Sequence, residues 1–107
     1  MNDNHTRRRS RAFVATITPS TIEVKKSQHS AEYILCRDAG FQRPGDPPQV
    51  RTAMAFGELA QSVKSLLREG EPVTLAVQYD GATIKLLGPP REEQLASAAR
   101  RLERVAA

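Results

Sequence analysis

The sequence predicts a mostly β fold, a five-stranded barrel with one helix between its third and fourth strands and a second helix at the C-terminus. Two observations lead to this prediction. Short segments in which apolar and polar residues alternate, as in half-buried strands, are interrupted by a helical pattern at 59–67 and followed by another at 91–107. The chain has 107 residues, which suits one domain with a modest core.

The strand pattern recurs along most of the chain. The segments that carry it are 13–17, 21–25, 32–37, 50–56, 73–79 and 82–86. The first two can form one long strand bent at Pro19, because proline donates no ladder hydrogen bond. The last two are predicted to form a hairpin, since Asp80-Gly81 between alternating runs is typical of a type I′ turn. Residues 38–49 contain two glycines and three prolines and are predicted to be a long loop.

Two helices follow from the 3.6-residue period. The first stripe consists of Leu59, Ala60, Val63, Leu66 and Leu67, and Gly70 is expected just past the end of that helix. The second stripe consists of Leu95, Ala98 or Ala99, Leu102 and Val105. This second helix is expected to pack on its own barrel or on a partner subunit, and the alternative is a helix that lies on DNA.

The order of these elements is that of an OB fold, a small Greek-key barrel that commonly binds oligonucleotides on one face. We therefore expect an OB-fold domain at 12–89, preceded by a disordered basic arm at 1–11 and followed by an amphipathic helix at 90–107. The net charge is only +4, but four arginines lie in the first eleven residues. Such an arm suits nucleic acid, and the alternative is a solubilising terminus.

Other function classes find little support. The chain has one cysteine and two histidines, which permits no intrachain disulfide and no zinc site. Cys36 lies in an apolar run and is predicted to be a small buried hydrophobe. No catalytic set of side chains and no phosphate-cradling glycine loop is present. We expect a binding protein, not an enzyme, with no cofactor, metal, membrane or small-molecule substrate, and a cytoplasmic location.

One segment resembles a known family. Phe56-Gly57-Glu58-Leu59-Ala60, followed by Leu67-Arg68-Glu69-Gly70 and Val73, resembles bacterial and phage single-stranded DNA-binding proteins over residues 50–79. The resemblance implies an OB fold that binds single-stranded DNA without sequence preference, in replication, recombination or repair, and a homo-oligomer (dimer or tetramer) built by pairing barrel edges. The chain departs from that family in having no tryptophan, in Val50 where a stacking tryptophan is usual, and in a basic C-terminal end.

Single-strand binding needs cations along the phosphates and flat side chains under the bases. The candidate residues are Arg7, Arg8, Arg9, Arg11, Lys25, Lys26, Arg37, Phe41, Arg43, Arg51, Phe56, Tyr79 and Lys85. Phe41 is included because it is expected in the long loop, where its side chain is not needed for packing of the core.

The strand at 50–56 leaves two functions open. One of its faces carries Val50, Thr52, Met54 and Phe56, and the other carries Arg51, Ala53 and Ala55. The resemblance turns the first face toward DNA, whereas hydrophobicity alone would bury it. An apolar face without tryptophan also suits a protein contact. The predicted function is single-stranded DNA binding, and the alternatives are a protein-binding or structural OB module and RNA binding.

Overall fold

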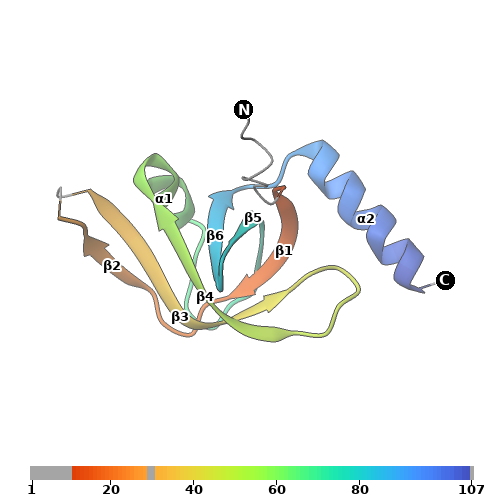
Figure 1. Ribbon diagram of the computed structural model, residues 1–107, viewed down its shortest axis with the longest axis horizontal. Helices are drawn as coiled ribbons and strands as arrows, with labels where there is room; N and C mark the ends of the chain where they lie inside the picture. The colour runs from red at the N-terminus through yellow and green to blue at the C-terminus, as the bar shows by residue number, and fades with distance from the viewer. Residues whose placement is uncertain (1–10, 29–30, 107) are drawn as a thin grey trace, which may run out of the picture.

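The computed structural model describes residues 11–28 and 31–106 (Figure 1). The elements, in chain order, are β1 (Phe13–Thr18), β2 (Glu23–Lys26), β3 (Glu32–Gln42), β4 (Gln49–Phe56), α1 (Gly57–Lys64), β5 (Val73–Asp80), β6 (Thr83–Gly88) and α2 (Glu92–Ala106). The predicted arm at 1–11 therefore lies outside the described residues except for Arg11, which is exposed.

Five strands close into a barrel in the order β1-β5-β6-β4-β3, and β3 pairs with β1 to complete it. All of these pairs are antiparallel except β4–β6, which is parallel. The short strand β2 pairs with β3 as an additional strand. A closed mixed barrel with a helix between its third and fourth barrel strands is consistent with the OB fold, so the predicted fold class is confirmed.

The two pieces that were predicted to form one long strand bent at Pro19 are two separate strands, β1 and β2, with a common partner. β1 pairs with the end of β3, from Thr18 opposite Gly40 onward, and β2 pairs with the start of β3 at residues 32–35. The two pieces thus follow one partner strand on either side of Pro19, which is fully buried. The proline carbonyl accepts a hydrogen bond of 2.7 Å from the N–H of Gly70.

The prediction of a loop at 38–49 was wrong for its first half. β3 continues to Gln42, and only residues 43–48 connect it to β4. Gly40 does not interrupt β3, because the strand is paired with β1 on one side and with β4 on the other. Its regularity is broken instead by a bulge between Cys36 and Ala39, where Asp38 has a φ of +53°.

Two turn predictions also need correction. α1 ends at Lys64, so Gly70 does not end that helix; it lies in a later turn with a φ of +81°. In the hairpin, Asp80 pairs with Thr83, which leaves Gly81 and Ala82 as the loop. The φ of Gly81 is +64° and that of Ala82 is negative, which fits a type II′ turn in place of the predicted I′ turn.

The two ends of the barrel are closed differently. At the α1 end, Ala60, Val63 and Leu67 are buried in the core, while Leu59 and Leu66 of the predicted stripe stay partly exposed. At the opposite end, the rings of Phe13, Phe41 and Tyr79 pack together. Their ring centroids lie 4.9 Å (Phe13–Tyr79), 6.0 Å (Phe41–Tyr79) and 6.2 Å (Phe13–Phe41) apart.

The C-terminal helix α2 lies beside β1 at this second end of the barrel (Figure 1). It turns Gln94, Ala98 and Arg101 toward the barrel, and these residues are half-buried. Leu95 and Leu102 are 46% and 52% exposed, so these two leucines do not pack on their own barrel, and packing on a partner subunit stays a prediction for them. Within the part of the chain that the structure describes, no helix is long and apolar enough to cross a membrane.

Candidate nucleic-acid interface

The strand register assembles one continuous surface on the outside of the barrel. On β4, Ala53 and Ala55 point into the core, so Val50, Thr52, Met54 and Phe56 point outward. On β3, the outward residues opposite them are Tyr33 and Leu35, followed by Arg37. We call these seven residues the outer face. The resemblance therefore oriented this strand correctly, and hydrophobicity alone would have reversed it.

Neighbouring strands extend the outer face with charged side chains. Lys25 on β2 pairs with Tyr33, which pairs with Phe56, so these three residues form one cross-strand row. The next row runs from Glu23 through Leu35 and Met54 to Lys85 on β6. Cations thus lie on both sides of an apolar and aromatic strip.

Two aromatic rings stack at one end of this strip. The centroids of Tyr33 and Phe56 are 5.9 Å apart with an interplanar angle of 28°, and Phe56 is 41% exposed. Flat, partly exposed rings are the usual support for unpaired bases. Val50, at the other end of β4, is 67% exposed.

Glu23 holds two of the cations. Its carboxylate accepts a hydrogen bond of 3.1 Å from Arg37 Nε and forms an ion pair of 3.3 Å with Lys25 Nζ. Both pairs are partly exposed to solvent and contribute little to stability. The Glu23 carboxylate therefore occupies the position in which a phosphate could contact Lys25 and Arg37.

A second group of candidate residues lies at the end of the barrel where the rings of Phe13, Phe41 and Tyr79 pack together. Arg43 lies over the ring of Phe13, with its guanidinium carbon 4.1 Å from the ring centroid. Tyr79 is 37% exposed, but Phe41 is only 3% exposed. The prediction that Phe41 is a loop aromatic was wrong: it is a strand residue that points inward opposite Ile17 and belongs to the core.

Two further candidates, Arg51 and Lys26, do not point toward the outer face. Arg51 alternates with the outward residues of β4 and donates two hydrogen bonds to Gln49 Oε1, at 2.7 and 3.1 Å. Lys26 follows Lys25 on β2 and so points to the opposite side. Arg7, Arg8 and Arg9 lie outside the described residues.

Sequence reasoning missed Tyr33 and Leu35 as members of the outer face. These two residues belong to the apolar run at 33–36, in which no polar residue alternates with the apolar ones. The sequence pattern therefore did not distinguish the outward from the inward side chains. The available signal was the strand at 50–56, whose small inward alanines mark its outward set. Transferring that assignment to β3 requires the register, which pairs Tyr33 with Phe56.

Comparison of the chain with known proteins gives no further information on the function of this surface. No family model, curated protein or solved structure matches the chain. Membership of the single-stranded DNA-binding family therefore stays a prediction from residues 50–79, as do the homo-oligomer and the cytoplasmic location. Among residues 11–28 and 31–106, no group of three or more histidine, cysteine, aspartate or glutamate side chains is placed to hold a metal ion.

Cys36 is completely buried, as predicted for a small core residue. Burial, with smaller contributions from the charges of Glu23 and Glu69, raises the pKa of its thiol to about 11 from an ordinary value of 9.0. Because only the neutral thiol is favoured in the folded state, its contribution to stability is present below pH 9 and is lost as the pH rises toward 11.

The thiol is therefore expected to be unreactive toward a disulfide reagent at pH 8 until the chain unfolds. The measurement is the rate of modification in buffer and in denaturing urea, followed by absorbance. A native-state rate close to the denatured rate would contradict the buried position of Cys36.

Proposed function

We propose that this chain binds single-stranded DNA without sequence preference, through the outer face. The observation that supports the proposal most is the register of β2, β3, β4 and β6, which lines up Lys25, Tyr33 and Phe56 in one row. The adjacent row adds Lys85. Stacked rings with cations on both sides match the two needs of a single strand, a support for the bases and positive charge for the phosphates.

The shape of the outer face favours a single strand over a duplex. Readers of duplex DNA usually insert a helix or a two-stranded ribbon into the major groove. Here the candidate side chains lie on a curved sheet surface that is partly apolar, with Val50 and Phe56 exposed. Unpaired bases can lie flat on such a surface, whereas in a duplex the faces of the bases are covered by stacking.

The direct test is fluorescence anisotropy of a labelled oligo-dT of about 16 nucleotides, the upper site size of one OB fold. We expect saturable binding that duplex DNA competes poorly. If Lys25, Arg37 and Lys85 each contact a phosphate, log K should fall by about 2 per tenfold rise in salt. No binding at about 50 mM salt would contradict the proposal.

A protein contact is the second candidate function, favoured by the 67% exposure of Val50 and by its apolar neighbours on β4. If it is correct, Val50→Asp should disrupt an assembly of the chain with its partner and oligo-dT should not bind. If the DNA proposal is correct, oligo-dT should bind the wild-type chain whatever its assembly state.

Glu23→Gln is expected to tighten oligo-dT binding by roughly two- to fivefold at low salt, because it frees Lys25 and Arg37 for phosphates. The matched control is Glu58→Gln, which removes the same charge from an exposed position on α1. Equal affinities for the two variants would show that Lys25 and Arg37 do not contact the strand.

A further inference from the structure

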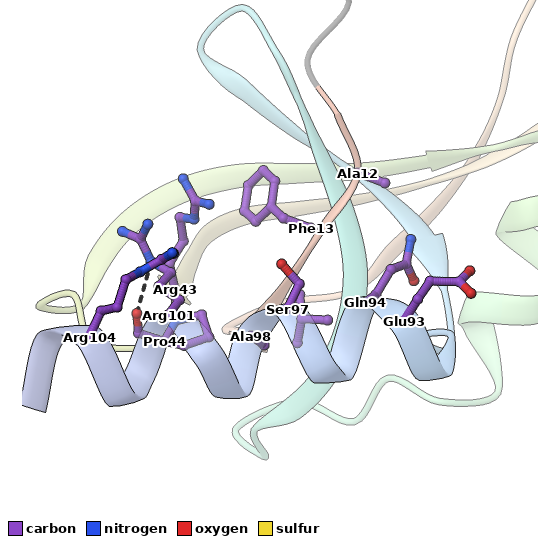
Figure 2. Close-up of a pocket in the computed structure, with 11 residues that line it drawn as sticks. Ala12, Phe13, Arg43, Pro44, Glu93, Gln94, Ser97, Ala98, Arg101 and Arg104 are labelled. Carbon is purple, nitrogen blue, oxygen red and sulfur yellow. Dashed lines mark hydrogen bonds between the residues drawn. The ribbon is translucent and has the colours of Figure 1, made fainter.

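A groove of about 180 Å³ lies between α2 and the start of β1 (Figure 2). Neither Tyr33 nor Phe56 lines it. Three arginines line it: Arg43 from the connection after β3, and Arg101 and Arg104 from α2. Figure 2 shows their side chains gathered on one side of the groove, with Arg43 the nearest of the three to the ring of Phe13.

The arginines in the groove differ in how they are held. Both carboxylate oxygens of Asp46 accept hydrogen bonds of 2.9 Å from Arg101, whose Nε also donates to the carbonyl of Pro44 at 3.0 Å. Arg101 is therefore fixed and neutralised. Arg43 is held by stacking over Phe13, and its covered Nε has no hydrogen-bond partner.

The groove has an excess of positive charge. Within the described ranges, 11–28 and 31–106, neither Arg43 nor Arg104 forms an ion pair with a carboxylate. Arg11 lies beside Arg43 in an adjoining depression. The acidic residue of the lining, Glu93, is eight positions before Arg101 on α2, about 12 Å along the helix.

We propose that this groove binds a phosphate group, and that the phosphate belongs to the same nucleic-acid strand that crosses the outer face. Arginine is suited to phosphate because its planar N–H groups form paired, charge-assisted hydrogen bonds. Stacking on Phe13 fixes Arg43 in advance, and Arg101 forms a rigid wall. The inference rests on the proposed function only for the source of the phosphate.

The size of the groove selects the kind of ligand. Pockets for drug-sized molecules usually measure about 300–1,000 Å³ and are mostly apolar. At about 180 Å³ and lined by arginines, this groove suits one phosphate group better than a whole nucleotide. A backbone phosphate enters such a site while its base stays outside.

The site is tested first with inorganic phosphate, which replaces chloride at constant ionic strength while ¹H–¹⁵N spectra are recorded. The amides of Ser97 and Ala98, which line the groove, should shift and saturate. Arg104→Gln should weaken this binding at least threefold, whereas Arg100→Gln, the same change on the same helix outside the groove, should not. Absence of a saturable shift, or equal effects of the two variants, would overturn the site.

The source of the phosphate is tested with labelled oligo-dT. Arg104→Gln should weaken binding roughly three- to tenfold at low salt and reduce the salt slope by about 0.7, and Arg100→Gln should do neither. Phosphate binding in the groove with unchanged oligo-dT binding by Arg104→Gln would overturn DNA as the source. If the wild-type chain failed to bind oligo-dT, the proposed function would fail, whereas saturation by inorganic phosphate would still support the groove.

Discussion

Phe41→Ala is expected to lower the free energy of unfolding by about 3–5 kcal/mol, the usual cost of removing a buried phenylalanine ring. The ring is 3% exposed and packs against Phe13 and Tyr79 at one end of the barrel. Removal of the ring would leave a cavity between these two aromatic side chains. A small domain has only about 5–15 kcal/mol in total, so the variant should be close to unfolding.

Urea unfolding followed by circular dichroism measures this loss. The control is Val50→Ala, which shortens a side chain that is 67% exposed and should change the free energy by less than about 0.5 kcal/mol. The opposite result would be a stable Phe41→Ala variant with weakened oligo-dT binding. It would mean that Phe41 stacks on bases, as its neighbourhood in the sequence suggested.

Phe56→Ala is expected to weaken oligo-dT binding by about five- to 150-fold, because stacking contributes about 1–3 kcal/mol per base. Tyr33→Ala should act in the same direction, since the two rings stack at 5.9 Å and support one another. Phe56 is 41% exposed, so the stability of the variant should fall much less than that of Phe41→Ala.

The measurement is an anisotropy titration of each variant at equal salt. Leu102→Ala is the matched control, since Leu102 is apolar and 52% exposed but lies on α2. If Phe56→Ala and Leu102→Ala bound oligo-dT equally well, the rings would not be in contact with the bases, and the outer face would lose its main support.

Much of the fold follows from short-range patterns in the sequence. Alternation located most of the strands, and Gly57, with its φ of +61°, marks the sharp change from β4 to α1. The small inward alanines of β4 left Val50 and Phe56 outside. The strand pattern and the turn at Gly57 depend on neighbouring residues only, whereas the outward orientation of Val50 and Phe56 came from the resemblance of residues 50–79, because hydrophobicity alone would have buried them.

The rest depends on which strands pair. Phe41 follows Gly40 and precedes a proline-rich segment, so only its pairing with β1 and β4 reveals a strand and a buried ring. The same pairing brings Tyr33 beside Phe56. On α2, the leucine stripe predicted burial, but the barrel contacts Ala98 and Arg101 instead, because Asp46 anchors that side of the helix.

If a single strand lies across the outer face, adding oligo-dT should change the ¹H–¹⁵N shifts of the residues that form this face. We expect the largest saturable changes at Tyr33, Leu35, Met54 and Phe56, with smaller changes at Lys25 and Lys85. Residues of α1 such as Ser62 should change little. Changes confined to α1 and β5, or no saturable change at all, would show that the strand does not bind to the outer face.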